Sequence, residues 1–294
     1  MKIAVFGSSG FVGREVVKLL RSETEHTIIE AIDSLSKSKI NLLDINAIDA
    51  FLSEHKPDII VNCAGVVDNS DIAKNNPVFT TNLIHAVVNS GLAVKRIIIS
   101  GSAAEYGEVM LSDLPVDEDT PTNPQAIYGK SKLEETTKAL ELAKKHGLNI
   151  TILRIFNPIG KNMHPKFLVS RLIDQVNEIK SGKRDVIEVN RLDAKRDYVD
   201  VRDIANAFKV IVENAPSYEV YNVGSGKAMS NAELLNEVII NSGLKVEPTI
   251  REMADKPEPV VAERADISRI VSEFGWSPKY TLSETVKGIM SNEE

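Results

Sequence analysis

The chain has 294 residues, of which 43% are hydrophobic and 26% charged, as in a soluble globular protein with one large or two closely packed domains. Its net charge of -7 argues against general nucleic-acid binding, because its arginines are isolated rather than clustered. A single cysteine excludes an intramolecular disulfide framework, and neither a signal peptide nor a membrane-spanning run is visible, so we expect a cytoplasmic protein without a membrane partner.

The first half of the chain alternates short β-branched runs with longer amphipathic segments. Continuous apolar strands separated by helices are what a parallel sheet covered on both faces requires. We therefore predict an α/β fold, a Rossmann-type doubly wound parallel sheet, over residues 1–156. The predicted strands cover residues 3–6, 28–32, 59–61, 97–99 and 150–153, and the predicted helices lie near 11–21, 46–54, 71–89 and 127–146.

The second half is less regular, because prolines and glycines separate shorter elements there. We predict a smaller mixed α/β domain over residues 157–294 that binds the substrate. Residues 191–223 are expected to return to the first domain.

A glycine-rich loop follows the first predicted strand and leads directly into the first predicted helix. Such a turn places free backbone N–H groups and the positive end of a helix dipole at the pyrophosphate of a dinucleotide. A purely structural turn is the alternative. The loop residues predicted to bind NAD or NADP are Gly7, Ser9, Gly10, Phe11, Val12 and Gly13.

Asp33 closes the second predicted strand about 20 residues beyond Gly13. An acid at that position accepts hydrogen bonds from the adenosine ribose hydroxyls, which favours NAD over NADP. Ser34, Lys37 and Lys39 follow closely and could hold a 2'-phosphate instead. A simple cap of the strand end is the other alternative for Asp33.

Further cofactor contacts are predicted where adenine and the dinucleotide backbone would pass along the sheet edge. Cys63 lies in an apolar run and is expected to be a small buried filler rather than a reactive thiol. The predicted positions are Asp44, Ile45, Cys63, Ala64, Gly65 and Ile155.

Tyr128 and Lys132 are four residues apart in the predicted helix 127–146, so they share one face of it. An ammonium held beside a phenol favours the phenolate, which allows the tyrosine to exchange a proton in carbonyl and alcohol chemistry. Taken alone the pattern is weak, because such pairs occur by chance on many solvated helices.

Ser102 follows the predicted strand 97–99, at the edge where α/β sheets place groups that contact ligands. With the glycine loop, Ser102 and the Tyr128–Lys132 pair, the chain resembles an extended short-chain dehydrogenase/reductase. The resemblance continues through residues 153–160, 196–203 and 221–226, and it covers essentially the whole chain.

This resemblance implies a nucleotide diphosphosugar substrate and hydride transfer between a sugar carbon and the nicotinamide, without a metal. It makes Tyr128 the acid or base, Ser102 the hydrogen-bond donor to the reacting oxygen, and Lys132 the residue that holds the cofactor ribose. Asn157 and Arg196 would face the sugar nucleotide. A loop-capping asparagine and a surface ion pair are the alternatives for these two residues.

The resemblance also implies a homodimer, in which the helix near 71–89 and the helix of Tyr128 pair with their copies. Apolar side chains stand there at helical spacing, although core packing within one chain explains them equally well. They are Ile84, Val88, Leu133 and Leu140.

Ala103 and Ala104 stand where the family's 4,6-dehydratases carry an Asp-Glu pair for water elimination. Methyl groups perform no acid–base chemistry, so a dehydratase is not expected. Residues 193–203 resemble the GDP-4-keto-6-deoxy-mannose reductase group, which favours NAD(P)H-dependent reduction of a GDP- or dTDP-linked 4-keto-6-deoxy sugar. An NAD-dependent epimerase of the UDP-glucose type and a non-catalytic NAD(P)-binding protein are the alternatives.

One departure from that reductase group concerns the nucleotide. Where the group carries an Arg-x-Arg-Pro element, this chain has residues 254–257, which include Lys256. Lys256 offers a point charge to a phosphate but not the planar two-point contact of arginine. The identity of the nucleotide and of its sugar therefore stays open.

Overall fold

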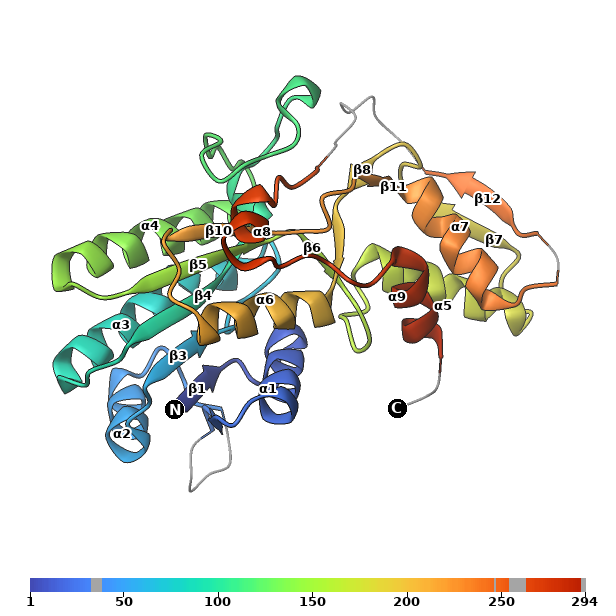
Figure 1. Ribbon diagram of the computed structural model, residues 1–294. Helices are drawn as coiled ribbons and strands as arrows, with labels where there is room; N and C mark the ends of the chain where they lie inside the picture. The colour runs from blue at the N-terminus through green and yellow to red at the C-terminus, as the bar shows by residue number, and fades with distance from the viewer. Residues whose placement is uncertain (33–38, 246, 254–262, 292–294) are drawn as a thin grey trace.

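A six-stranded parallel sheet forms the centre of the computed structural model, which describes residues 1–32, 39–245, 247–253 and 263–291 (Figure 1). Every neighbouring pair of its strands is parallel, which confirms the predicted Rossmann-type doubly wound fold. In sheet order the strands are β10 (Val220–Val223), β5 (Ile150–Ile155), β4 (Arg96–Ser102), β3 (Ile59–Asn62), β1 (Lys2–Phe6) and β2 (Thr27–Glu30).

Helices cover both faces of this sheet, because successive strand residues point to opposite faces and each face has its own apolar core. In β1, for example, Ile3 and Val5 belong to one core, whereas Ala4 and Phe6 belong to the other. The first core is covered by α1 (Phe11–Glu23), α6 (Val201–Glu213) and α8 (Ser268–Phe274), and the second by α2 (Ile45–His55), α3 (Asn76–Ser90) and α4 (Ile127–His146) (Figure 1).

The predicted helix near 71–89 is divided into a 3₁₀ turn, η1 (Asp71–Asn75), and α3. Pro77 lies in the first turn of α3, the part of a helix that tolerates a residue without an N–H group. No helix in the described part of the chain is both long enough and apolar enough to cross a membrane.

The smaller part of the molecule lies beside the sheet, on the right in Figure 1, around a third apolar core. Its helices are α5 (Leu168–Lys180), α7 (Asn231–Ser242) and α9 (Leu282–Met290). Its strand pairs are β6 (Asn157–Ile159) with β9 (Tyr198–Asp200), β8 (Lys195–Arg196) with β11 (Met229–Ser230), and β7 (Val186–Val189) with β12 (Thr249–Glu252). Because α6, β10 and α8 belong to the larger part, the chain passes between the two parts several times; the boundary at residue 156 stays a prediction.

Asp197, between β8 and β9, joins segments that are far apart in the sequence. Its fully buried carboxylate accepts hydrogen bonds from the N–H groups of Ser225, Gly226 and Ala265 and from the Ser225 hydroxyl, at 2.6 to 3.0 Å. Without the carboxylate, the buried Ala265 N–H would have no partner, and the half-buried Ser225 and Gly226 would lose theirs.

We expect Asp197→Ala to lower the free energy of unfolding by about 3 kcal/mol, because it removes four hydrogen bonds and leaves the buried Ala265 N–H without a partner. Urea unfolding followed by circular dichroism measures this. Asp193→Ala is the control, since Asp193 is exposed and solvent screens its ion pair with Arg191, so its loss should lower the free energy of unfolding much less. Equal losses in the two variants would contradict the role of Asp197.

Candidate active site

The glycine loop between β1 and α1 makes a close backbone contact with the end of β3. Gly7 has a φ of 72°, and a Cβ atom there would lie 2.5 Å from the backbone nitrogen of Ala64. A Cβ atom on Gly13 would lie 2.1 Å from the carbonyl oxygen of Gly7. After Gly10, α1 begins without a side-chain cap and without an acidic residue in its first turn, so its first N–H groups are available to an anion.

The loop lies at the point where the strand order reverses, since β2 and β3 are on opposite sides of β1. Open α/β sheets bind ligands outside the carboxyl ends of the strands at such a point. The uncapped helix and the glycine cradle therefore fit the pyrophosphate of a nicotinamide dinucleotide, which supplies or accepts hydride when it is bound.

The other residues predicted to bind the cofactor lie along the same sheet edge. Asp44 caps α2 by accepting hydrogen bonds from the N–H groups of Asn46 and Ala47. Burial raises the pKa of the Cys63 thiol to about 12, which makes it an unreactive filler. Asp33 lies outside the described residues. Ser9 lies in the loop, Phe11 and Val12 in the first turn of α1, Ile45 at the start of α2, Gly65 after β3 and Ile155 at the end of β5.

Ser102 ends β4 and caps the 3₁₀ turn η2 (Ala103–Glu105). Its Oγ accepts a hydrogen bond from the Ala104 N–H at 3.2 Å, so the hydroxyl proton is available to a ligand oxygen. The buried carboxylate of Glu105 accepts the Ser102 N–H and is paired with Arg154 Nε, both at 2.9 Å. This ion pair fixes the backbone that presents the hydroxyl.

Tyr128 lies in the first turn of α4, which packs against η2. A Cβ atom on Gly129 would lie 2.5 Å from the carbonyl oxygen of Ala104, so this packing requires glycine. The Tyr128 N–H donates to Asn69 Oδ1 at 3.0 Å, which satisfies one of the unpaired N–H groups at the helix start. Among the residues that the structure describes, the Tyr128 hydroxyl has no hydrogen-bond partner, so it can exchange a proton with a ligand.

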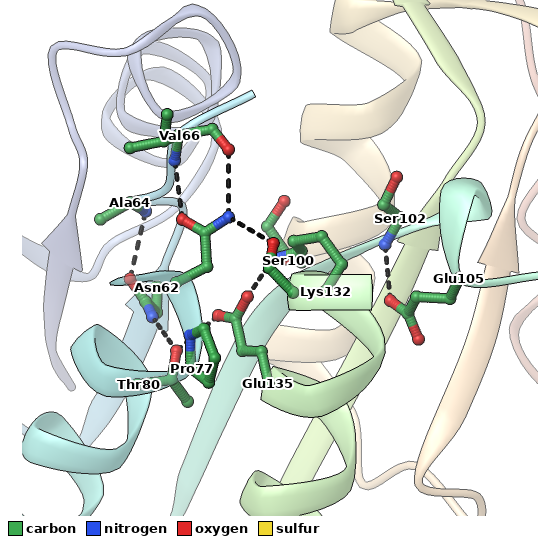
Figure 2. A network of polar contacts seen from close by, with 12 residues as sticks. Asn62, Ala64, Val66, Pro77, Thr80, Ser100, Ser102, Glu105, Lys132 and Glu135 are labelled. Atoms are coloured by element: carbon green, nitrogen blue, oxygen red, sulfur yellow. Dashed lines mark hydrogen bonds and ion pairs between the residues drawn. The ribbon is translucent and has the colours of Figure 1, made fainter. Parts of the chain in front are cut away.

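Lys132 lies one turn further along α4 with only 5% of its side chain exposed. Its Nζ donates to the Ser100 carbonyl at 2.6 Å and lies 2.5 Å from Glu135 Oε2 (Figure 2). Burial lowers the pKa of this ammonium, but the Glu135 carboxylate, with smaller effects of Tyr128 and Glu105, offsets burial and raises the pKa above its ordinary value. Lys132 therefore carries its charge at neutral pH.

Tyr128 and Lys132 line one small pocket of about 40 Å³, together with Ser100 and residues 63–67. The structure thus brings two of the predicted catalytic residues together with the segment that the glycine loop contacts. Ser102, two residues after Ser100 on β4, is not among the residues that line this pocket.

Asn157 and Arg196 line a separate cavity of about 260 Å³ in the smaller part. Asn157 Nδ2 donates to Glu263 Oε2 at 2.8 Å, and Arg196 Nε lies 3.5 Å from Glu263 Oε1. The two residues predicted to contact the substrate are therefore linked through one carboxylate. Lys256, predicted to bind a phosphate, lies outside the described residues.

Comparison with known proteins identifies the family, because the sequence pattern of one family matches residues 3–224, from β1 to the end of β10. The chain belongs to the NAD dependent epimerase/dehydratase family. This match confirms the predicted family and, at the level of the family, the predicted nicotinamide cofactor and enzyme class. The individual site residues stay predictions.

The relatives of this family member include a reductase and an epimerase. GDP-6-deoxy-D-mannose reductase of Pseudomonas aeruginosa is 25% identical over 302 residues, which cover 100% of this chain and 97% of the reductase. UDP-glucose 4-epimerase of Halalkalibacterium halodurans is 26% identical over 324 residues, which cover 97% of this chain and 93% of the epimerase. The solved structure of RMD from Pseudomonas aeruginosa complexed with NADPH is 25% identical, with a TM-score of 0.89, and the match covers 98% of this chain and 97% of that chain.

Two acidic residues at the site escaped the sequence analysis. Glu135 is three residues from Lys132 on one helix, a spacing that indicates an ion pair and could have been noticed. Glu263 is 106 residues from Asn157 in the sequence, and no local pattern links them.

In this member of the NAD dependent epimerase/dehydratase family, a phenol, a serine hydroxyl and a buried ammonium lie near the carboxyl ends of β3 and β4. These groups can stabilise an oxygen that changes between carbonyl and alkoxide while a proton moves to or from Tyr128. Because η2 begins with Ala103 and Ala104, the turn after Ser102 offers methyl groups at the positions where an elimination would need an acid and a base.

Proposed function

We propose that this protein uses NADH or NADPH to reduce the C4 keto group of a GDP- or dTDP-linked 4-keto-6-deoxy sugar. The observation that carries the proposal is the match to GDP-6-deoxy-D-mannose reductase over nearly the full length of both chains. The alignment with the reductase spans 302 positions, against 324 for the epimerase. The 294-residue chain therefore needs fewer insertions and deletions to match the reductase.

In this reaction Tyr128 would donate its proton to the alkoxide that forms at C4 as hydride arrives. Ser102 would hold the same oxygen through its free hydroxyl proton, at the place where negative charge develops. The charged ammonium of Lys132, close to Tyr128, would stabilise the phenolate that remains.

The cavity around Asn157 and Arg196 would receive the sugar nucleotide. Its wall combines these polar side chains with the rings of Phe167 and Tyr198, which suits a diphosphate beside a flat base. Arg196 can form a two-point contact with a phosphate, although Glu263 already neutralises part of its charge. Lys256 is the further cation that we propose for the diphosphate.

A second candidate function is 4-epimerisation of a UDP-linked sugar. The 26% identity to a UDP-glucose 4-epimerase favours it, since this value matches the identity to the reductase. The two reactions differ in the fate of the cofactor: an epimerase regenerates it within one turnover, whereas a reductase consumes it.

We also propose a cytoplasmic homodimer that forms through α3 and α4. Ile84 is fully buried in the core of one chain, and Val88 and Leu140 pack against that core, so core packing explains these three residues. Leu133 lies outside the apolar cores of the described residues and is half-buried, and Val78 on α3 is 39% exposed. These two side chains remain available to a second copy.

A panel of keto sugars tests the proposed reaction. Purified protein with NADH or NADPH should oxidise the cofactor when a GDP- or dTDP-linked 4-keto-6-deoxy sugar is added, which the absorbance of the reduced nicotinamide measures. UDP- and CDP-linked 4-keto sugars are the comparison substrates. If no keto sugar oxidises the cofactor, and the protein interconverts UDP-glucose and UDP-galactose without added NAD, the proposed function is epimerisation and not reduction.

We expect Tyr128→Phe to lower kcat by about a hundredfold to ten-thousandfold while leaving NAD(P)H affinity nearly unchanged, because only the proton donor is lost. Steady-state kinetics and quenching of protein fluorescence by the cofactor measure the two quantities. Tyr218→Phe is the control, since Tyr218 is 52% exposed and is not among the residues that line the pocket. Near-normal turnover of Tyr128→Phe would remove this tyrosine from the mechanism.

For the dimer, we expect sedimentation at micromolar concentration to give about twice the chain mass of 32.3 kDa. Leu133→Asp should shift the protein toward the monomer, because a charge at an apolar interface is unfavourable. Leu111→Asp, a change at a 63% exposed leucine in another segment, should leave the mass unchanged. A wild-type protein that sediments only as the monomer would contradict the dimer.

A further inference from the structure

Glu135 is a buried carboxylate that the proposed reaction does not use. It is 1% exposed, and both of its oxygens have partners: Oε2 lies 2.5 Å from Lys132 Nζ, and Oε1 accepts the Thr80 hydroxyl at 2.5 Å. A carboxylate is unstable away from water unless such partners compensate it. Burial raises the pKa of the Glu135 carboxyl, and the ammonium and the hydroxyl offset part of that rise.

The contacts of Glu135 continue to the wall of the pocket. Thr80 Oγ1 accepts a hydrogen bond from Asn62 Nδ2 at 2.9 Å, and Asn62 Oδ1 accepts the Ala64 N–H at 3.1 Å (Figure 2). Ala64 supplies the backbone nitrogen that the glycine loop approaches. A line of side chains therefore connects the Lys132 ammonium to the backbone on the cofactor side of the pocket.

A second bridge joins the same two elements. Asn76 exchanges hydrogen bonds with the N–H and carbonyl of Val66 at 2.8 and 3.0 Å, and its Nδ2 donates to Ser131 Oγ at 3.2 Å. Ser131 precedes Lys132 on α4. The segment 63–67 and the helix that carries the ammonium are thus held together at two places.

We propose that Glu135 is a positioning residue, whose carboxylate holds the Lys132 ammonium at the floor of the pocket and couples it to the segment 63–67. Without this carboxylate, the only polar contact of Lys132 Nζ in the described part of the chain is the Ser100 carbonyl. The role of Glu135 in turnover rests on the proposed function of Lys132. The ion pair between Glu135 and Lys132 is independent of that proposal.

Glu135 is the acidic group in direct contact with this ammonium. The titratable groups that face Lys132 are Tyr128 and Glu135 on α4, Glu105 after β4 and Cys63 after β3. Glu105 is already paired with Arg154, and the Cys63 thiol is protonated. The charge balance of the buried ammonium therefore depends mainly on Glu135.

Glu135→Gln tests the proposal, because it keeps the shape of the side chain and removes its charge. Glu134→Gln is the matched control: Glu134 is the preceding residue, its side chain is 54% exposed, it pairs with Lys138 at the surface, and its loss changes the net charge equally. With a 4-keto sugar nucleotide, we expect Glu135→Gln to lower kcat about tenfold to hundredfold and leave KM nearly unchanged, since Glu135 has no place in the cavity of Asn157.

The same variant should move the basic limb of the pH profile to lower pH by about one unit or more, because Lys132 loses its proton more easily without the neighbouring negative charge. Glu134→Gln should retain the profile of the wild type. A Glu135→Gln enzyme with the kcat and pH profile of Glu134→Gln would overturn the proposal.

Thermal unfolding of the cofactor-free protein provides a readout that needs no substrate. In the wild type the raised pKa of Lys132 contributes stability at neutral pH that is lost as the pH rises through that pKa. In Glu135→Gln, we expect burial to outweigh the remaining groups and to lower the pKa of Lys132, so that the folded state gains stability relative to the unfolded state as the pH rises. The Tm deficit of the variant should therefore be largest near pH 7 and shrink toward pH 10.

A Tm deficit that is the same at every pH would assign Glu135 to packing alone and overturn the proposal. If the wild type reduces no keto sugar, the proposed function fails. The pH dependence of Tm still shows whether Glu135 stabilises the charge of Lys132. If Glu135→Gln yields no folded protein, Glu135→Asp replaces it: this variant keeps the charge but shortens the reach to Lys132. A several-fold lower kcat for Glu135→Asp supports positioning, and an unchanged kcat overturns it.

Discussion

Close backbone contact at the carboxyl edge of the sheet is the constraint on which the rest of the structure depends. The loop after β1 reaches the end of β3 only because Gly7 has no side chain, and α4 reaches η2 only because Gly129 has none. A methyl group at either position would meet backbone atoms about 2.5 Å away, and backbone cannot move aside as a flexible side chain can. Both contacts bring segments from different strands to one place, where Tyr128 and Lys132 line their pocket.

Two buried ion pairs then hold the side chains and backbone of the site in place. Behind the hydroxyl of Ser102 lies the pair of Glu105 and Arg154, and behind the pocket of Lys132 lies the pair with Glu135. Buried pairs of this kind add little stability compared with well-packed apolar groups, because desolvation opposes their attraction, although removing one partner alone is costly. These ion pairs mainly restrict position, because a charged group that is buried and fully hydrogen-bonded has few other places where it can be stable. The reacting groups therefore need little rearrangement as charge develops on a substrate oxygen.

The sequence was sufficient for those parts of the structure that local patterns determine. Apolar periodicity predicted the strands β1 to β5 and the helices between them, and the topology of a parallel sheet placed Ser102 near the helix of Tyr128. The contact of Glu263 with Asn157 could not be predicted, because it depends on how the smaller part packs and not on spacing along the chain. Ile84 was predicted at a dimer interface but is buried within one chain. Helical spacing could not show this, because it does not distinguish a face that packs inward from a face that contacts a second copy.

The position of β10 has a consequence for biosynthesis. This strand completes the sheet beside β5, yet it comes from Val220–Val223, after much of the smaller part has been made. Until then the N–H and C=O groups along one side of β5 have no strand to pair with, and such an edge invites association with other chains. A fragment that ends before Val220 keeps this exposed edge permanently. The part that contains the six-stranded sheet is therefore not one contiguous stretch of sequence, since its last strand is made only after much of the smaller part.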